Sequence, residues 1–531
     1  MLRVFAKIYI YIVYNIYIVY IINMNNWRIS MKKIHVIGAG IGGLSAAIRL
    51  QVSGYDVEIF EKESMPGGKA HQIKDKGFTF DVGPTIVMMP EIFREVFTLA
   101  GKNPDDYIPM KRLDPMYDVF FVDKPYRHYE IDSDLVSLIE IAEKRGKGNA
   151  AGLLSYVSEI YKRYEVALEH FISRPFRYKR DMYNPFMIRQ AFKLKTFDSA
   201  DKMMSKFIED KDLQQMLSFQ TLYIGVSPKK GPSLYNIIPM IELLYGIWFI
   251  EGGMHTLPQQ MAKVFVELGG KIHYNKTVDS IAIENKKVLG VNVDGALRES
   301  NYVMCNADFP YAMKNLVLEP KAKGKYSDKK IDSMDYSCSC LVFYWGVKGT
   351  YDTLKVHNFI ISNDLDTNLD SIFNGSMIKD PSIYLHIPSN ADTTMAPDGH
   401  SAFYVLLPVS ELGVAQYEYD EETIQAYRTS ALNILRGIEG LEDIENQIIV
   451  EHTFTPNDFE STFNAYRGAT FGLQPTLMQS NHFRPQSKSL NCEGLYFTGS
   501  STHPGAGVPI VIEGGRIAAE ELRRDAEDSF K

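Results

Sequence analysis

The pattern of hydrophobic and polar positions is most regular near the start of the chain. An apolar run at 34–37 ends in a glycine-rich turn, and small or apolar residues then recur at helical spacing as far as Gly54. A second strand-like run, 56–61, ends in an acidic residue, and a glycine pair follows it at 67–68. The pattern predicts a strand, a tight turn, a helix and a second strand in immediate succession.

The rest of the chain alternates between strand-like and helical patterns. An apolar strand at 495–499 precedes a glycine-rich loop and a closing helix at 511–522. Between these ends we expect a strand with a turn at 77–84, a helical region at 151–192 and an amphipathic helix at 257–268. A group of short strands at 270–293 and two apolar strands at 336–347 and 403–408 are expected to follow.

Three glycines in the first turn have separate physical tasks. Gly38 allows a sharp turn after the strand, Gly40 lets the backbone approach a pyrophosphate, and Gly43 lets the helix pack closely on the strand. The free N–H groups and the dipole at the start of the helix favour phosphate. Glu61 follows Gly43 by 18 residues, near the spacing of an acid that binds ribose hydroxyls. We therefore predict an adenine dinucleotide site, in preference to a glycine turn in some other α/β unit.

A second glycine-rich loop, 499–509, joins the final strand to the closing helix. Small residues and glycines at such a junction allow a cofactor to approach the backbone, with helix N–H groups facing it. The loop is therefore predicted to contact the cofactor rather than only to connect two elements.

Composition and charge fit a multi-domain globular protein. The chain has 531 residues, of which 45% are hydrophobic and 23% charged, so two or more domains are expected. The net charge of −8 argues against a nucleic-acid-binding protein, which is usually basic. The cysteines have no metal-ligand spacing, so we predict no metal site and reduced core thiols at Cys305, Cys338, Cys340 and Cys492.

The beginning of the chain stands apart from this pattern. Residues 8–22 are almost entirely Ile, Tyr and Val, preceded by Arg3 and Lys7. The run is shorter than the ~20 residues that span a bilayer, and it lacks a small-residue cleavage site. We expect residues 1–30 to be a leader outside the native fold, with Met31 as the start, in preference to a membrane anchor or signal sequence.

Residues 34–69 resemble the FAD-binding signature shared by amine oxidases and carotenoid desaturases. Glycine spacing alone does not separate FAD from NAD, but the resemblance, which includes Gly67 and Gly68, implies FAD. In these families the next residue is usually an arginine near the FAD phosphates, whereas this chain has Lys69. A lysine can neutralise a phosphate but lacks the bidentate fork of an arginine.

The loop 502–509 resembles the C-terminal signature of bacterial carotenoid (phytoene-type) desaturases. More narrowly, several segments are similar to desaturases that act on dehydrosqualene (4,4'-diapophytoene), at 78–90, 219–242, 335–338 and 455–460. The resemblance covers the chain from Met31 to about Arg523. It departs at Lys69 and at 512–515, Ile-Glu-Gly-Gly, where such enzymes carry small and uncharged residues.

The resemblance implies an α/β fold, with a Rossmann-like FAD-binding domain of the amine oxidase and carotenoid desaturase type and an inserted α+β substrate domain. We expect a discontinuous FAD-binding domain over 31–95, 230–305 and 480–531, and a substrate- and membrane-facing domain over 96–229 and 306–479. The residues predicted to hold FAD are Gly38, Ala39, Gly40, Ile41, Gly42, Gly43, Glu61, Lys62, Gly67, Gly68, Lys69, Val278, Gly499, Ser500, Gly507 and Val508.

The activity implied is the FAD-dependent, stepwise desaturation of dehydrosqualene, a linear thirty-carbon isoprenoid, to diaponeurosporene and diapolycopene-type carotenoids. A hydride passes from an allylic carbon to the flavin, and a proton is then lost. Besides the reduced flavin itself, the candidate proton acceptors near the predicted cofactor loops are Asp81, His503 and Glu513. Each has a structural alternative, as a turn cap, a packing partner of Pro504 or a helix start. The apolar run 232–249 is expected either to line the tunnel of such enzymes or to form a core helix.

Other functions stay open from the sequence. The chain could be a diapocarotenoid end-group oxygenase of the same flavin superfamily, or a phytoene desaturase with a forty-carbon substrate, and product analysis would separate these. A flavin amine oxidase and a non-enzymatic isoprenoid-binding protein are further alternatives, which turnover of a small amine or the absence of bound flavin would reveal.

A substrate that resides in a bilayer implies contact with the membrane. Residues 174–180 are rich in arginine and lysine, and 182–188 carry bulky apolar side chains, a composition suited to an interface with anionic lipid. A solvated loop beside a buried helix is the competing interpretation. We expect a cytoplasmic protein, peripheral on the inner face of the cell membrane, with an apolar isoprenoid substrate and no nucleic-acid partner.

Overall fold

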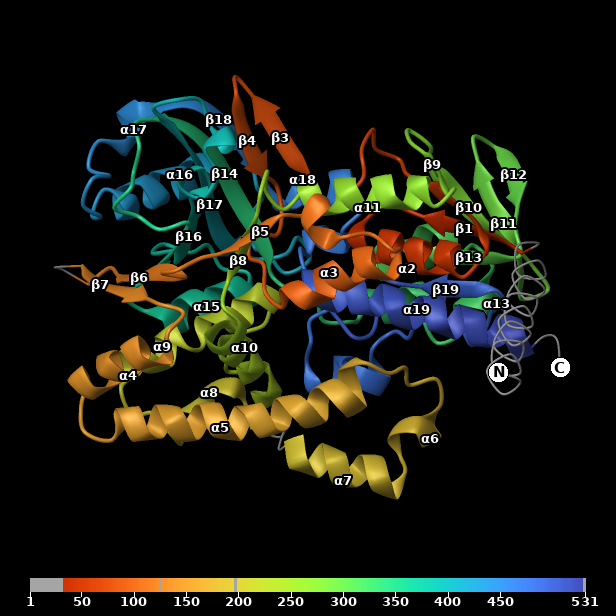
Figure 1. Cartoon of the computed structure of the whole chain (residues 1–531), viewed down its shortest axis with the longest axis horizontal. Coiled ribbons are helices and arrows are strands. Elements are labelled where there is room, and N and C mark those ends of the chain that lie inside the picture. The colour runs from red at the N-terminus through yellow and green to blue at the C-terminus, as the bar shows by residue number, and fades with distance from the viewer. Residues whose placement is uncertain (1–31, 124–125, 195–197, 529–531) are drawn as a thin grey trace, which may run out of the picture.

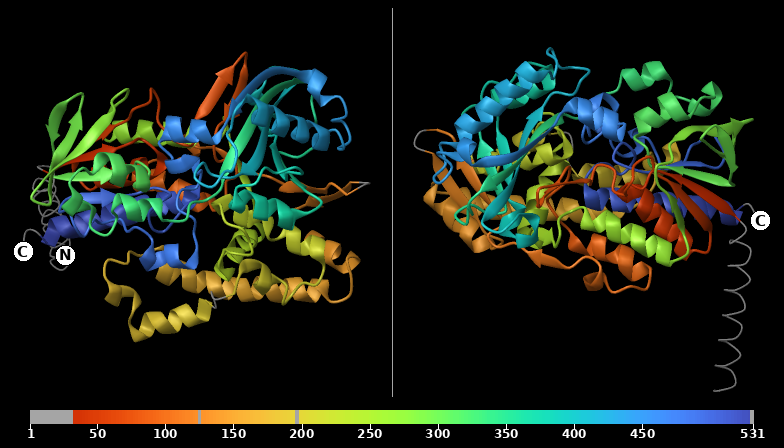
Figure 2. Two further views of the ribbon diagram at one scale, coloured as in Figure 1. Left: turned by 180° about the vertical axis from the view of Figure 1, so that it is seen from behind. Right: turned by 90° about the horizontal axis from the view of Figure 1, so that it is seen from above.

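The computed structural model describes residues 32–123, 126–194 and 198–528, which form two sheet-based halves and a helical layer (Figure 1, Figure 2). The predicted leader, residues 1–30, and the predicted start at Met31 lie outside these ranges. No helix within them combines the length and hydropathy that crossing a bilayer requires.

One half is built on a five-stranded parallel sheet in the order β19-β13-β1-β2-β9. Ile34 and Val36 of the central strand are fully buried, as expected where helices and loops cover both faces of a parallel sheet. The sheet confirms the α/β class and the predicted strand–helix–strand unit. Its strands are β1 (Lys33–Ile37), β2 (Asp56–Phe60), β9 (Lys271–His273), β13 (Tyr302–Cys305) and β19 (Leu495–Phe497).

Helices cover one face of this sheet, and a small antiparallel sheet lies on the other (Figure 1). Buried Ala46 and Ala47 allow the helix after the glycine turn to pack closely against its neighbours. The helices are α2 (Ile41–Val52), α3 (Pro90–Leu99), α11 (Thr256–Glu267) and α19 (Val508–Asp528), and the small sheet contains β10 (Val278–Glu284), β11 (Lys287–Val293) and β12 (Ala296–Glu299).

The other half is built on a seven-stranded sheet in the order β18-β14-β17-β16-β15-β6-β7, in which only the pair β6 and β15 is parallel. Alternate residues of β14 enter different cores: Phe343 and Trp345 pack with α16 (Glu421–Leu435), whereas Val342 and Tyr344 pack with β4 (Phe78–Asp81). The strands are β6 (Tyr117–Phe121), β7 (Arg127–Ile131), β14 (Ser339–Lys348), β15 (His357–Ile361), β16 (Ile383–His386), β17 (His400–Val409) and β18 (Ile448–Phe454).

A helical layer lies on one side of both halves (Figure 1). The predicted helical region 151–192 is broken into three helices, because the chain turns between 173 and 178 and again before Pro185. A five-residue π-helical stretch, 168–172, extends the first of them. The layer contains α5 (Asn149–Ala167), α6 (Lys179–Met182), α7 (Pro185–Leu194), α8 (Ala200–Met204), α9 (Lys211–Met216) and α10 (Ile237–Tyr245).

Shorter elements connect these parts. β5 (Met110–Arg112) pairs with β8 (Trp248–Ile250), and β3 (Gln72–Asp75) forms a hairpin with β4. The remaining helices are α4 (Leu135–Lys144), α12 (Phe309–Tyr311), α13 (Pro320–Lys323), α14 (Asp328–Asp332), α15 (Leu365–Asn374), α17 (Ile444–Gln447) and α18 (Pro456–Phe463).

The hydrophobic cores cross the predicted domain boundaries, as two examples show. α10 falls in the predicted FAD-binding domain, but Ile237 and Met240 belong to the core of the large sheet and the helical layer. Conversely, Phe309 and Leu316 fall in the predicted substrate domain but pack with the strands of the parallel sheet. Each segment joins the core that can bury its apolar face, whichever part of the chain that core comes from.

Candidate cofactor and substrate cavity

The carboxyl ends of the parallel strands bring three distant segments to one edge of the sheet. Gly38 follows β1, Asn306 follows β13 and Gly499 lies just beyond β19. Open α/β sheets bind ligands at this edge. A cavity of about 890 Å³ includes all three residues and extends between the two halves of the molecule.

The first glycine turn has the backbone geometry that a dinucleotide requires. Gly38 has a φ of +90°, which residues with a side chain rarely adopt. A Cβ atom on Gly43 would lie 2.3 Å from the carbonyl oxygen of Gly38, so the contact of α2 with the turn requires glycine. Gly40 caps α2 without any side-chain hydrogen bond, which leaves N–H groups of the first turn for a phosphate.

Glu61 stands at the end of β2 with its carboxylate held by backbone. Its Oε2 accepts a hydrogen bond from the N–H of Ala39 at 2.6 Å, and its Oε1 accepts one from the N–H of Glu63 at 2.9 Å. Burial raises the pKa of Glu61, while the two N–H groups lower it. Each carboxylate oxygen keeps a further lone pair, so Glu61 can still accept hydrogen bonds from ribose hydroxyls.

The glycine pair and Lys69 close over the turn. The N–H of Gly67 donates to the carbonyl oxygen of Ala39 at 2.9 Å, so the pair is fixed against the first glycine motif. Lys69 extends along the cavity, and its Nζ donates to the carbonyl oxygen of Thr470 at 2.8 Å. Burial lowers the pKa of Lys69. This lysine lines the predicted cofactor position in place of the arginine of the related signature, and its contact with a phosphate stays a prediction.

The second glycine-rich loop is held by Arg484, which lines the cavity and is almost fully buried. Its guanidinium donates to backbone carbonyl oxygens of Leu473, Gln479, Ser500 and Thr502 at 2.6–3.2 Å. These bonds fix the loop between β19 and α19. Sequence reasoning missed Arg484, because a residue that acts on distant carbonyl groups leaves no local motif.

Two polar residues after β13 were also missed. Nδ2 of Asn306 would lie 2.7 Å from a Cβ on Gly40, so this amide occupies the space beside the glycine turn. Asp308 accepts a short hydrogen bond from Ser501 in the second loop. The available signal was their position directly after a buried strand, where the carboxyl edge of a sheet collects ligand-binding residues.

The structure brings most of the predicted cofactor residues together around this cavity. Two members of the set lie behind its wall: Ala39, which binds Glu61, and Gly43, which packs on Gly38. The residues that line it are Gly38, Gly40, Ile41, Gly42, Glu61, Lys62, Gly67, Gly68, Lys69, Val278, Gly499, Ser500, Gly507 and Val508. Their individual roles remain predictions.

Asp81, a candidate proton acceptor, is not among the residues that line the cavity. Its carboxylate accepts hydrogen bonds from the N–H groups of Met254 at 2.7 Å and His255 at 3.1 Å, just before α11. Burial raises the pKa of Asp81 to about 6. The geometry is that of the structural alternative, a cap on a turn and helix start.

His503 is likewise buried behind the cavity wall. Its Nε2 lies 2.9 Å from the carbonyl oxygen of Arg174, and its ring packs edge-on against Phe176. Burial lowers the pKa of His503 to about 4. Its contacts tie the second glycine-rich loop to the segment before α6.

Glu513 is the candidate proton acceptor that does line the cavity. Its Oε1 and Oε2 accept hydrogen bonds from Nη2 and Nε of Arg516, at 2.5 and 2.9 Å. This bidentate ion pair occupies both oxygens of the Glu513 carboxylate.

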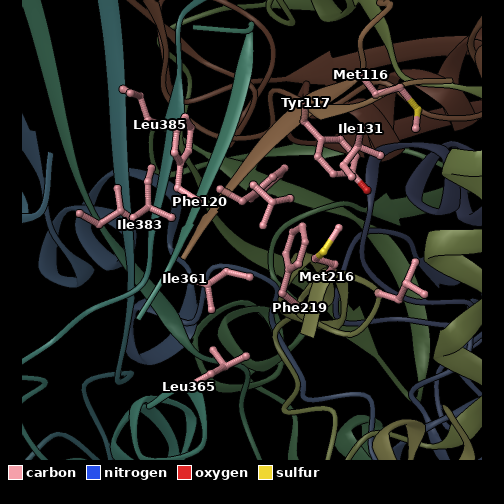
Figure 3. Close-up of a cluster of buried hydrophobic side chains, with 14 of the residues drawn as sticks. Met116, Tyr117, Phe120, Ile131, Met216, Phe219, Ile361, Leu365, Ile383 and Leu385 are labelled. Atoms are coloured by element: carbon pink, nitrogen blue, oxygen red, sulfur yellow. The ribbon is translucent and has the colours of Figure 1, made fainter. Parts of the chain in front are cut away.

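Beyond the glycine motifs the cavity wall becomes apolar. Phe219, Ile361 and Leu365 come from three different elements and lie in one cluster (Figure 3). Ile238 and Ile241 of α10 line the same space, so the predicted apolar run is both a core helix and a cavity wall. This apolar arm is also lined by Phe171, Ile172, Leu194, Leu222, Leu234, Ile237, Phe359 and Ile383.

The fold and the cavity define a flavoprotein of the amine oxidoreductase type, and the comparisons agree. Residues 41–523 match the family of flavin containing amine oxidoreductases. The chain belongs to this family and is a flavin-dependent oxidoreductase.

Within that class the chain is similar to carotenoid desaturases. It is 42% identical over 498 residues to the 4,4'-diapophytoene desaturase (4,4'-diaponeurosporene-forming) of Staphylococcus haemolyticus, covering 93% of this chain and 99% of that one. It is 43% identical over 500 residues to the protein of the same name from Staphylococcus aureus strain Newman, with the same coverage.

Solved structures share the fold at low sequence identity. An oxidoreductase from Methanosarcina mazei aligns with a TM-score of 0.62 and 17% identity, over 92% of this chain and 100% of that one. Putrescine oxidase bound to putrescine aligns with a TM-score of 0.60 and 12% identity, over 93% and 99% of the two chains. These likenesses confirm the predicted fold class.

Proposed function

We propose that the chain is an FAD-dependent desaturase that converts 4,4'-diapophytoene into 4,4'-diaponeurosporene and more unsaturated diapocarotenes. The observation that carries the proposal is one continuous cavity that joins a dinucleotide turn to an apolar arm. A hydrocarbon offers no hydrogen-bonding group, so its binding depends on apolar burial, worth roughly 25 cal/mol per Å². The similarity to desaturases over almost the whole chain supports the same reaction.

FAD is the flavin that fits these residues. The turn from Gly38 to Gly43 suits a pyrophosphate, and Glu61 suits the adenosine ribose. FMN has neither group, because it carries a single phosphate and no adenosine. When bound, the flavin supplies the two-electron acceptor for oxidation of a C–C single bond. The chain supplies the binding groups, fixes the orientation and keeps water out of the apolar arm.

The test is expression of the full chain in a host that accumulates 4,4'-diapophytoene, followed by absorption spectra and masses of the extracted pigments. Yellow or orange polyene bands are expected, and their positions count the double bonds. A folded, flavin-loaded protein that yields only colourless extract would overturn the proposal. Conversion of an added, already desaturated carotene would then support the end-group oxygenase.

We also infer a peripheral contact with the inner face of the cell membrane, made by α6, α7 and the segment before them. Large apolar side chains on this surface are at least 44% exposed, which is unusual for a surface that faces only water. Met182 and Leu194 of the same helices line the cavity, so this surface adjoins the apolar arm. The exposed residues are Tyr178, Tyr183, Phe186, Ile188 and Phe192.

Arginines beside this surface support an anionic lipid as its partner. A pocket of about 510 Å³ is lined by Arg174, Arg177, Arg180 and Arg524, together with Glu169 and Asp181. Arg177 and Arg524 pair with acidic residues of α19, whereas Arg174 and Arg180 have no ion pair among the described residues. Arginines next to exposed aromatic rings are typical of proteins that bind anionic membrane surfaces.

Vesicle co-sedimentation tests this contact. The full chain is expected to bind phosphatidylglycerol vesicles more tightly than phosphatidylcholine vesicles, and Phe186→Ser with Arg180→Ser to weaken that binding. Leu297→Ser with Val414→Ser removes apolar side chains of similar exposure elsewhere and serves as the control. Equal binding by both double variants would contradict the inference.

A further inference from the structure

Tyr384 places a polar group on the wall of a cavity whose far arm is apolar. Its hydroxyl oxygen lies 2.6 Å from Oγ1 of Thr85 and 2.7 Å from Nδ1 of His357. Thr85 and Tyr384 line the cavity, whereas His357 is fully buried behind them. Two hydroxyls and an imidazole therefore form a hydrogen-bonded chain that leads from the cavity into the large sheet.

The register of β15 and β16 builds this chain. His357 pairs with His386, and Phe359 pairs with Tyr384, so the four side chains share one face of the sheet. The rings of Phe359 and Tyr384 stack at 5.0 Å, and those of His357 and His386 stack at 4.9 Å. Stacking on both strands fixes the direction of the Tyr384 hydroxyl.

The hydroxyl lies where the cofactor end of the cavity meets the apolar arm. Thr85 lies two residues after Gly83, and a Cβ on Gly83 would lie 2.1 Å from the carbonyl oxygen of Lys69. This segment is therefore next to the predicted cofactor residues. On its other side the Tyr384 ring contacts Phe359, which lines the apolar arm. Tyr384 therefore lies between the predicted cofactor residues and the apolar arm.

Each carboxylate on the cavity wall already has a hydrogen-bond or ion-pair partner. Two backbone N–H groups bind Glu61, and Lys62 pairs with Glu63. The Ser501 hydroxyl donates to Asp308, and Arg516 pairs with Glu513. No histidine is among the described residues that line the cavity. The Tyr384 hydroxyl, which does line it, is hydrogen-bonded to Nδ1 of His357. The carboxylates are Glu61, Glu63, Asp308 and Glu513.

We propose that Tyr384 receives the proton that the substrate loses during desaturation and passes its own hydroxyl proton to His357. This proposal rests on the proposed function. Desaturation breaks two C–H bonds and forms a C=C bond. One hydrogen leaves with its electron pair to the bound flavin, and the other leaves as a proton to the Tyr384 oxygen, while the original Tyr384 proton moves to Nδ1 of His357. After product leaves, the proton returns through Tyr384 to the cavity.

The electrostatics suit a relay of this kind. Burial, and then His386, lower the pKa of His357 well below its usual value, so its ring is neutral and Nδ1 can accept a proton. Burial raises the pKa of Tyr384, so its proton leaves only as another arrives. A weak neutral base is sufficient, because the C–H bond beside an allylic cation is far more acidic than an imidazolium ion.

Tyr384→Phe tests the relay, since it removes the hydroxyl and keeps the stacking ring. Under anaerobic conditions, flavin reduction by 4,4'-diapophytoene is expected to fall about 100-fold, the typical contribution of a general base. Wild-type reduction is expected to be slower in D₂O than in H₂O, because the relayed proton exchanges with solvent, and the variant is expected to lose this difference. Tyr344→Phe removes a hydroxyl bonded to the Val82 carbonyl oxygen outside the cavity and is the control, which should keep the solvent effect.

A measurement without turnover completes the test. In protein labelled with ¹⁵N-histidine, His357 is expected as the neutral tautomer protonated at Nε2, and Tyr384→Phe should shift its Nδ1 resonance. If the wild type makes pigment but Tyr384→Phe keeps both the wild-type rate and its solvent effect, the relay is wrong and the proposed function stands. If the wild type makes no pigment, the proposed function itself has failed.

Discussion

The two ends of the cavity are built in opposite ways. The cofactor end is mainly backbone, with glycines and helix N–H groups beside a few carboxylates, and much of it comes from residues 38–69. The apolar end is made of side chains from α5, η3 (Phe219–Ile224), α10, β15 and α15, which are far apart in the sequence. Backbone geometry demands particular residues at particular spacings, whereas an apolar wall accepts many combinations of similar volume. The first end is therefore specific in sequence, and the second is specific only in shape.

The largest expected effect is at the backbone end. Gly43→Val would put a side chain against the carbonyl oxygen of Gly38, where even a Cβ would lie at 2.3 Å. We expect the purified variant to carry no flavin, as measured by absorption at the flavin bands. Gly514→Ala is the matched control: a Cβ there lies 3.4 Å from its nearest neighbour, and alanine favours helix over glycine. Normal flavin content in Gly43→Val would show that the turn does not bind the cofactor.

A bulky substitution in the apolar arm should have the reverse signature. Ile238→Trp fills part of the cavity from α10 and leaves the glycine motifs untouched. We expect unchanged flavin content and turnover lowered by about 10- to 100-fold, since a substrate displaced from the reacting position loses rate steeply. Leu244→Trp on the same helix, at a position 42% exposed, should keep normal turnover. If both variants behave alike, the arm does not hold the substrate.

Glu61→Gln sharpens the assignment of the adenosine half. The amide keeps the shape but loses the charge, and one hydrogen bond to a charged group contributes roughly 1.5–3 kcal/mol. FAD affinity of the apoprotein should therefore fall at least about 10-fold, whereas riboflavin affinity should change little. Reconstitution titrations measure both. An equal loss for riboflavin would place Glu61 at the flavin ring instead.

Asp81 should affect stability rather than turnover. Its pKa is raised from 3.8 to about 6 in the folded protein, so between these values the folded state binds more protons than the unfolded state. This contribution to stability therefore grows as pH falls through 6 and levels off near 4, by up to about 3 kcal/mol. Asp81→Asn should remove that part of the pH dependence of the melting temperature. A reduced rate of flavin reduction in Asp81→Asn, with stability unchanged, would restore Asp81 as a proton acceptor.

The candidate proton acceptors show where sequence reasoning fails. Asp81, His503 and Glu513 were chosen because each lies close in sequence to a predicted cofactor loop. In the structure, Asp81 and His503 hold backbone segments, and Glu513 is engaged by Arg516. Proximity in sequence does not report which way a side chain points, and the backbone groups that capture it come from distant segments.

By itself the sequence determined the class of fold, the glycine turn with its acid, the second glycine-rich loop and the family, because these features depend on local backbone conformation and residue spacing. The tertiary structure alone decided that α10 lines the cavity, that Arg484 supports the second loop, and that Tyr384 meets Thr85 and His357. These contacts join residues that are 16 to 299 positions apart. They depend on strand register and on which core buries each segment, and no local pattern encodes either.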